Sequence, residues 1–372
     1  MRKSRSTPFL RRRIPAMFAS LLAVSASGGS PVAESDERFE RWDRDGDGRL
    51  VRDELPEGLR GNFERVDRNG DGVIDLREHL AVVGRGRVPP PPSMESVRVI
   101  GDIAYAGDGN PRRRLVLALP ARATVEVPLP LVVCIHGGGW RSGDHRAAIA
   151  ELMGYAASGR YAVASIGYRL SSEAIWPAQL DDCRAALRWI HDHADRIGID
   201  RDRIAVFGRS AGGHLAAMLA VRPDPPVRVR AAVDYYGPTD LLVMQAQAPE
   251  GVVIDHDAAD SPESRLVGAA VQSRPGVARD ASPINFVDAD DPPMLVIHGR
   301  RDRLVPFRQS VEFAQAIRDA GGPVTLLAVE DGGHGGFRDP SIPAAVRRVL
   351  EHHLHDAGEP PSGVDPAEFR KP

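Results

Sequence analysis

A Gly-x-Ser-x-Gly pentapeptide at residues 208–212 carries the strongest chemical signal in the chain. It lies between a short apolar stretch, residues 203–207, and a run typical of a helix from Gly213 onward. Glycine is needed two residues before and after the serine of so sharp a turn, because Cβ atoms there would collide. The turn raises the hydroxyl above the sheet, at the positive end of the following helix. The pattern therefore predicts Ser210 as the nucleophile of an acyl transfer.

A glycine-rich turn upstream supplies a second part of such a site. The apolar strand pattern of residues 131–135 ends in His-Gly-Gly-Gly-Trp at residues 136–140. Consecutive glycines let backbone N–H groups approach a developing oxyanion without obstruction by side chains. The N–H groups of Gly138, Gly139 and Ala211 are therefore predicted to form an oxyanion hole.

Two later strand patterns each lead into a loop with a titratable residue. Residues 294–299 precede Asp302, and residues 324–329 precede His334. We expect His334 to act as the general base and Asp302 to hold it in one tautomer. Asp240 is the alternative acid, and we favour Asp302 because the chain order Ser, Asp, His is that of α/β-hydrolases.

Other residues near these motifs have competing interpretations. His214 is expected to pack beneath the turn of the nucleophile, His136 to anchor the glycine-rich turn, and His298 to end a core strand. Trp140 and Tyr168 either line a pocket or pack in the core, and the sequence favours neither interpretation.

The chain from about residue 96 to residue 355 resembles bacterial α/β-hydrolase esterases of the His-Gly-Gly-Gly group. This group includes hormone-sensitive-lipase-like esterases and secreted carbohydrate acetyl or feruloyl esterases. Residues 161–170, 176–183 and 210–215 carry the resemblance together with the glycine-rich turn. It implies a serine carboxylester hydrolase that acts on a small-molecule or polysaccharide-linked ester, and small acyl groups such as acetyl or feruloyl are the first expectation.

A pair of loops near the N-terminus has oxygen donors at the ligand positions of an EF-hand. The predicted calcium ligands are Asp43, Asp45, Asp47, Arg49 and Glu54 in the first loop, and Asp67, Asn69, Asp71, Val73, Asp75 and Glu78 in the second. Arg49 and Val73 stand at the position that contributes a backbone carbonyl. Leu50 and Ile74 are expected to join the two loops through a short β-bridge.

These loops predict Ca²⁺ as a bound ion without a catalytic role. Only residues 55–66 separate them, so the segment resembles a shortened EF-hand pair with something of the dockerin spacing. It has too little apolar surface for a large sensor groove. Stabilisation of a small extracellular module is the first expectation. Docking to an extracellular partner is the second, and regulation of the active site is the third.

Two other functions fit parts of the sequence. A serine exopeptidase would use the same site on the same fold, although no propeller-like domain is present to restrict peptide access. A calcium-dependent docking protein with a silent hydrolase domain would use the N-terminal loops alone. The filled nucleophile, acid, base and oxyanion positions argue against the silent domain.

Composition agrees with a soluble enzyme. The 372 residues can hold one large α/β domain and a small module. A net charge of −3 gives no electrostatic reason to expect nucleic acid as a partner. The two cysteines, Cys134 and Cys183, lie in apolar settings and are interpreted as small core residues.

The N-terminus has the pattern of an export signal. Basic residues up to Arg13 precede a modest apolar stretch, residues 14–24, that is too short to span a membrane. No other segment approaches the length of a membrane span, and we expect a secreted or periplasmic protein. The predicted parts are a signal peptide at 1–33, an EF-hand pair at 34–86, a proline-rich linker at 87–95, the catalytic domain at 96–356 and a disordered tail at 357–372.

The predicted fold class is α/β: an α/β-hydrolase fold with a mostly parallel eight-stranded sheet flanked by helices, preceded by a small all-α EF-hand module. The predicted strands are residues 97–106, 115–119, 131–135, 161–166, 204–207, 231–235, 294–298 and 324–329. Helices such as 179–190 and 309–320 alternate with them, which indicates a sheet buried on both faces. Residues 245–291 are too many for a simple connection, and we predict an insertion over the active site.

Overall fold

The computed structural model describes residues 39, 42–44, 49–67, 72–75, 78–79 and 96–364. Contacts divide the chain into two compact units, Met1–Arg87 and Val88–Pro372. The predicted signal peptide and proline-rich linker lie outside the described residues.

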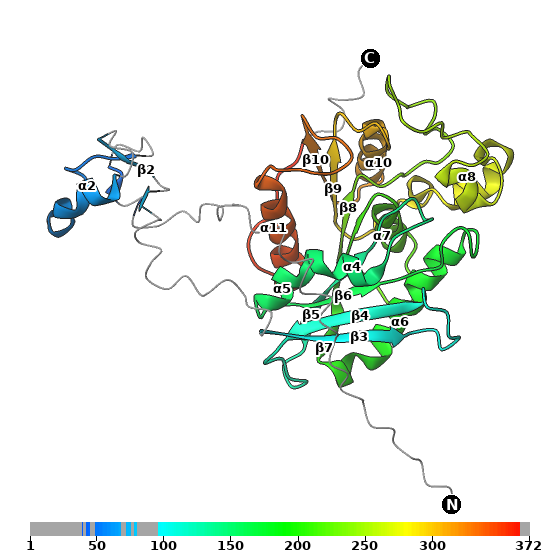
Figure 1. The fold of residues 1–372 in the computed structure, drawn as a ribbon, viewed down its shortest axis with the longest axis horizontal. Coiled ribbons are helices and arrows are strands. Elements are labelled where there is room, and N and C mark those ends of the chain that lie inside the picture. The colour runs from blue at the N-terminus through cyan, green and yellow to red at the C-terminus, as the bar shows by residue number, and fades with distance from the viewer. Residues whose placement is uncertain are drawn as a thin grey trace, which may run out of the picture. The chain divides into compact units, whose positions relative to one another are not determined.

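An eight-stranded sheet forms the centre of the second unit (Figure 1). Its strands are β3 (Val97–Ala104), β4 (Arg114–Pro120), β5 (Leu129–Ile135), β6 (Ala162–Ile166), β7 (Ile199–Arg209), β8 (Ala231–Tyr235), β9 (Met294–Gly299) and β10 (Val324–Val329). They are arranged in the order β10-β9-β8-β7-β5-β6-β4-β3. Strand β4 is antiparallel to β3 and β6, and the other neighbours are parallel. The predicted mostly parallel sheet is confirmed.

The central strands are buried on both faces because their apolar residues alternate between two cores. In β5, Val133 and Ile135 belong to one cluster of buried side chains, whereas Val132 and Cys134 belong to the other. This is the two-residue period of a strand. Both cysteines are buried and free, as predicted.

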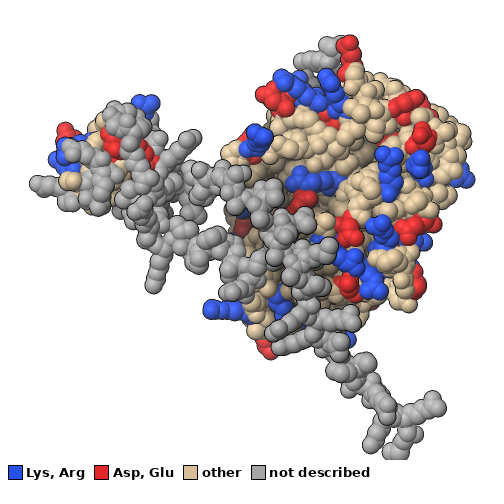
Figure 2. Space-filling view, viewed as in Figure 1, with Lys and Arg blue, Asp and Glu red and all other residues tan. Residues whose placement is uncertain are grey.

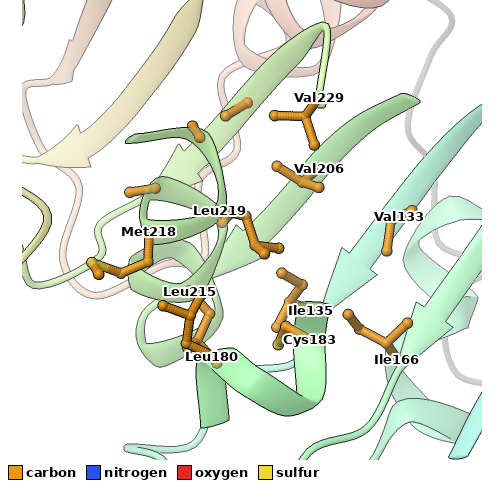
Figure 3. Close-up of a cluster of buried hydrophobic side chains, with 14 of the residues drawn as sticks. Val133, Ile135, Ile166, Leu180, Cys183, Val206, Leu215, Met218, Leu219 and Val229 are labelled. Carbon is orange, nitrogen blue, oxygen red and sulfur yellow. The ribbon is translucent and has the colours of Figure 1, made fainter. Parts of the chain in front are cut away.

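Helices cover both faces of the sheet (Figure 1). Their bounds are α4 (His145–Ala148), α5 (Met153–Ala157), α6 (Ala178–Ile197), α7 (Ala211–Val221), α8 (Pro262–Val267), α9 (Pro275–Asp280), α10 (Phe307–Asp319) and α11 (Ser341–His355). Helices α6, α7 and α10 contribute to one core, and α5 and α11 to the other. Figure 3 shows Leu215 and Leu219 of α7 facing Ile135 and Val206 of the sheet.

Helix α6 and strand β7 extend furthest beyond their predicted bounds. Helix α6 continues to Ile197 and ends where Gly198 takes a left-handed conformation with φ 72°. Strand β7 begins at Ile199, because Ile199 pairs with Leu129 before the register shifts. Within the predicted tail, the backbone N–H of Val364 donates to the carbonyl of Leu326 at 2.9 Å, which joins this residue to β10.

The first unit contains two very short strands, β1 (Arg49–Leu50) and β2 (Ile74–Asp75), with the 3₁₀ helix η3 (Glu57–Asn62) and the helix α2 (Phe63–Val66). Leu50 pairs with Ile74 in an antiparallel bridge, so the predicted pairing of these two residues is confirmed. The described core of this unit comprises Phe39, Leu50, Leu55, Phe63, Val66 and Ile74.

The described surface carries charges of both signs. On the face shown in Figure 2, basic and acidic side chains are interspersed over the second unit. Among the described helices, none is long and apolar enough to cross a membrane.

Candidate active site

Ser210 lies in the sharp turn between β7 and α7. Its backbone has φ 54° and ψ −123°, a conformation that a non-glycine residue adopts only when the surrounding structure imposes it. The backbone N–H of Ser210 donates to the carbonyl of Tyr235 at 2.8 Å, which ties the turn to β8. A Cβ atom added to Gly208 would lie 2.1 Å from the carbonyl oxygen of Gly212. The tight turn therefore requires glycine at this position.

The glycine-rich turn after β5 packs directly over Ser210. A Cβ atom on Gly137 would lie 2.7 Å from the carbonyl oxygen of Arg209 and 3.6 Å from the Cβ of Ser210. Gly138 and Gly139 have φ values of 109° and 57°. Glycine alone adopts both of these conformations readily.

Two peptide groups have their N–H directions fixed by what their carbonyls bind. The Gly138 carbonyl accepts hydrogen bonds from the backbone N–H groups of Arg141 and Ser142 and from the Ser142 hydroxyl. Because a trans peptide is planar, the N–H of Gly139 points the opposite way. The Ser210 carbonyl accepts from His214 N–H at 3.0 Å, so the N–H of Ala211 likewise points away from helix α7.

His334 and Asp302 are directly bonded. His334 Nδ1 lies 2.7 Å from Asp302 Oδ2. The other carboxylate oxygen, Oδ1, accepts from the backbone N–H groups of Leu304 at 2.7 Å and Val305 at 3.0 Å. Burial, the largest influence, would raise the pKa of Asp302, but hydrogen bonds from His298 and His334 outweigh it and hold that pKa well below its usual value. The carboxylate is therefore ionised wherever the protein is folded near neutral pH.

A second histidine contacts the same carboxylate, and this contact was not predicted. His298 Nε2 lies 3.1 Å from Asp302 Oδ2 and 3.0 Å from the carbonyl oxygen of Val305. Its Nδ1 lies 2.7 Å from the hydroxyl of Ser310 on α10. The only available signal was the four-residue separation of His298 and Asp302 across the end of β9.

One cavity brings the reactive groups together. It has a volume of about 690 Å³, and its lining includes Ser210, His334, Gly138, Gly139 and Ala211. His298 is not part of that lining and is fully buried. Of the two histidines on Asp302, only His334 is therefore placed to exchange a proton with Ser210 or a substrate.

Tyr236 is a further residue of the site that was not predicted. Its ring centroid lies 4.5 Å from that of His334, and it lines the cavity. Its phenol oxygen would lie 2.9 Å from a Cβ on Gly335. Tyr236 thus packs against both the imidazole ring and the loop that carries it.

The other acidic residues that could have held His334 have different partners. Asp240 is positioned by Gln309, whose Oε1 accepts from its backbone N–H at 2.7 Å, and its carboxylate accepts from Leu242 N–H. Asp331, three residues before His334 in the sequence, is exposed and paired with Arg301. Among the described residues, Asp302 is the acid bonded to His334.

His214, His136 and Tyr168 support the loops around the cavity. His214 is buried, accepts from Trp140 Nε1 at 3.1 Å and donates through Nε2 to the carbonyl of Ala281 at 2.7 Å. His136 stacks on Tyr168 with ring centroids 4.2 Å apart. Trp140 lines the cavity while it is almost fully buried, so both interpretations of this residue hold.

Residues 245–291 contribute to the same cavity. They contain α8, α9 and the 3₁₀ turns η6 (Val271–Ser273) and η7 (Pro283–Phe286). Ile254, Pro262 and Glu263 line the cavity together with Ser210 and His334. This wall is the part of the site best placed to contact a substrate away from Ser210.

The predicted calcium loops are described only in part. Glu54 accepts from the backbone N–H groups of Arg44 at 3.0 Å and Val51 at 2.9 Å, and Asp67 Oδ2 accepts from Gly72 N–H at 2.9 Å. Asp45, Asp47, Asn69 and Asp71 lie outside the described residues. No group of three metal-binding side chains is gathered within the described part of the chain.

The described part of the loops supplies carboxylate oxygens, which are suitable ligands for a hard cation. Glu54 and Glu78 are both buried carboxylates. A carboxylate that accepts one N–H at each oxygen keeps further lone pairs for an ion. Oxygen donors are the ligands that Ca²⁺ prefers.

Known proteins resemble the second unit. LipM, a probable carboxylic ester hydrolase of Mycobacterium tuberculosis, is 32% identical over 255 residues, which cover 63% of this chain and 57% of LipM. This chain thus spans less than two thirds of that relative. A truncated carbohydrate esterase from gut microbiota superimposes with a TM-score of 0.63 and 29% identity, over 71% of this chain and 99% of the other. The propionate-bound esterase Est2 of Thermogutta terrifontis gives a TM-score of 0.52 and 28% identity, over 73% of this chain and 95% of Est2.

The family match covers the part of the sheet that carries Ser210 and Asp302. The BD-FAE family matches residues 115–317, which are more than half of the 372 residues. The chain therefore belongs to the BD-FAE family.

Proposed function

We propose that the protein hydrolyses carboxylic esters, with Ser210 as nucleophile. The observation that carries the proposal is one cavity lined by the strained Ser210 turn, the glycine-rich turn and His334, whose imidazole is bonded to the buried Asp302. The esterase names of its relatives support the same reaction class.

Acylation begins when His334 Nε2 accepts the hydroxyl proton of Ser210 as the oxygen attacks the ester carbonyl. Asp302 holds Nδ1 protonated, so that Nε2 faces the cavity as a base. The N–H groups of Gly138, Gly139 and Ala211 stabilise the oxyanion, and each donor lowers the barrier by about 3 kcal/mol. His334 then returns its proton to the leaving alcohol.

Deacylation repeats these steps with water. His334 accepts a proton from water, whose oxygen attacks the acyl-enzyme carbonyl, and the same N–H groups stabilise the second oxyanion. The proton then passes to Ser210 Oγ as the acid leaves. The site returns to its starting state without a redox step.

For the substrate, we propose esters of small acyl groups. The alcohol part of the ester includes the sugar hydroxyl groups of polysaccharides. The carbohydrate esterase among the structural relatives and the propionate bound in Est2 support this class. The wall formed by Ile254, Pro262 and Glu263 mixes apolar and polar groups, which suits an alcohol that bears hydroxyl groups.

The test is a series of p-nitrophenyl esters of increasing acyl length, with Ser210→Ala as the blank. We expect Ser210-dependent turnover that is fastest for acetyl or propionyl esters. Turnover of aminoacyl anilides with no turnover of esters would favour the exopeptidase. Absence of any Ser210-dependent turnover would favour the silent hydrolase domain.

For the first unit, we propose that Asp43, Glu54, Asp67 and Glu78, with the remaining loop ligands, hold Ca²⁺. The ion would neutralise clustered carboxylates and stabilise the small module. Export to the periplasm or the exterior belongs to the same proposal, because the N-terminal residues have the pattern of an export signal. Calorimetric titration of the purified protein with CaCl₂ tests the binding, and absence of a calcium-dependent signal would contradict it.

A further inference from the structure

We propose that His298 is a positioning residue for the reaction: it acts through Asp302 as a permanent second donor that fixes the carboxylate and limits how tightly it holds the proton of His334. The inference depends on the proposed ester hydrolysis at Ser210. His298 is otherwise a buried histidine that the mechanism does not use, and it makes polar contacts at 2.7 to 3.1 Å with Ser310, Asp302 and Val305.

The contacts of His298 determine where its hydrogen lies. Nε2 faces two acceptors, the carboxylate oxygen of Asp302 and the carbonyl oxygen of Val305. Neither of these atoms can donate a hydrogen, so Nε2 carries one in either charge state of the ring. Nδ1 faces the Ser310 hydroxyl, which can donate or accept. The ring is therefore a donor to Asp302 whether it is neutral or charged.

The shared oxygen links the two histidines. Oδ2 of Asp302 lies 2.7 Å from His334 Nδ1 and 3.1 Å from His298 Nε2. A carboxylate oxygen that accepts two hydrogen bonds attracts each hydrogen less strongly than one that accepts a single bond. Removal of the His298 donor would strengthen the bond to His334, so that His334 holds its second proton to higher pH.

The groups around His298 leave Asp302 as its principal charged neighbour. Tyr236, after β8, has its ring centroid 6.2 Å away, and its phenol oxygen accepts from Arg209, which in turn donates to Glu151. From α10, the Phe307 ring lies 5.6 Å away, and Ser310 supplies only a hydroxyl. His334, after β10, is linked to His298 through the shared oxygen of Asp302.

The experiment compares the pH dependence of kcat/KM for p-nitrophenyl acetate in the parent, His298→Phe and His298→Gln. Phenylalanine fills the space but removes the donor, whereas the amide N–H₂ of glutamine can take the place of Nε2–H. We expect His298→Phe to lower kcat/KM at pH 8 roughly 10-fold. The acidic limb of the profile, where kcat/KM rises with pH as His334 loses a proton, should move to higher pH by about 0.5 to 1 unit. His298→Gln should return the limb close to the position of the parent.

A purely structural role would lower the rate without moving the limb, so an unmoved limb in a folded His298→Phe overturns the proposal. Equal limbs in the Phe and Gln variants overturn it as well, because the donor then has no effect. Should His298→Phe not fold, ¹⁵N NMR of the parent decides, with His298→Gln to assign the ring. A hydrogen on Nε2 from pH 5 to 9 supports the proposal, and its absence overturns it. Failure of the parent to turn over esters would instead overturn the proposed function.

Discussion

The two units of the protein position their carboxylates in different ways. In the second unit, Asp302 follows a six-residue strand in an eight-stranded sheet, and backbone N–H groups and two histidines fix both of its oxygens. In the first unit, the strands are two residues long, and the described core consists of six side chains. In the second unit, hydrogen bonds within the chain hold the carboxylate of the candidate site, whereas we expect the first unit to need a cation between its carboxylates.

The largest expected effect comes from Asp302→Asn. Both oxygens of Asp302 face donors, so either orientation of the asparagine amide sets its N–H₂ group against another donor. We expect kcat for p-nitrophenyl acetate to fall by roughly 10³ to 10⁴, because His334 loses its tautomer. Asp240→Asn is the matched control and should change kcat less than about 3-fold. Equal losses in the two variants would contradict the assignment of Asp302.

Gly139→Ala tests the glycine-rich turn. The φ of 57° disfavours alanine, and its Cβ would lie 3.3 Å from the Cβ of Pro262. We expect kcat to fall about 10- to 100-fold through displacement of the Gly139 N–H, with little change in unfolding temperature. Gly109→Ala has a similar φ of 78° and nothing within 4 Å, so it controls for backbone strain alone. Full activity of Gly139→Ala would remove this N–H from the oxyanion hole.

Glu54→Gln tests whether the first unit binds a cation through its carboxylates. Glu54 stands at the closing position of the first loop, where loss of a charged oxygen weakens the bound ion. Calorimetric titration of the full chain should show an affinity for Ca²⁺ at least about 10-fold lower in one of two sites. Asp53→Asn, whose side chain is largely exposed, is the control. Unchanged binding in Glu54→Gln would break the assignment of the calcium loop.

The smallest expected effect concerns Asp234, which lies beneath the turn of Ser210. Burial raises its pKa to about 7 from an ordinary 3.8. The folded state thus keeps a proton that the unfolded chain releases, so stability falls as the pH rises from about 4 to 7 and then levels off. We expect Asp234→Asn to unfold a few degrees higher than the parent at pH 8, with a smaller difference at pH 5. An equal difference in unfolding temperature between Asp234→Asn and the parent at pH 8 and at pH 5 would contradict the predicted pH dependence.

Much of the second unit was predictable because local sequence determines it. Alternating apolar runs predict strands, and glycines at fixed positions mark the turns after β5 and β7. The residues that follow those strands meet at one edge because parallel strands share a direction. Ser210, Asp302 and His334 were therefore singled out from the sequence alone.

Contacts between side chains were harder to predict. The bond between His298 and Asp302 depends on the loop conformation after β9, and the packing of Tyr236 on His334 depends on the register of β8 and β10. The pairing of Val364 with Leu326 joins residues that are distant in the chain, and no periodic pattern in the sequence predicts it. Such contacts arise from tertiary structure, which propensity and spacing do not encode.

The most direct test of the central claim is covalent labelling of the nucleophile. The purified protein would be treated with an organophosphate that carries a nitrophenolate leaving group, and peptides would be mapped by mass spectrometry. We expect one adduct per chain, on Ser210, with loss of esterase activity in the same proportion. Ester turnover that survives full labelling of Ser210, or inactivation with the adduct on another residue, would contradict it.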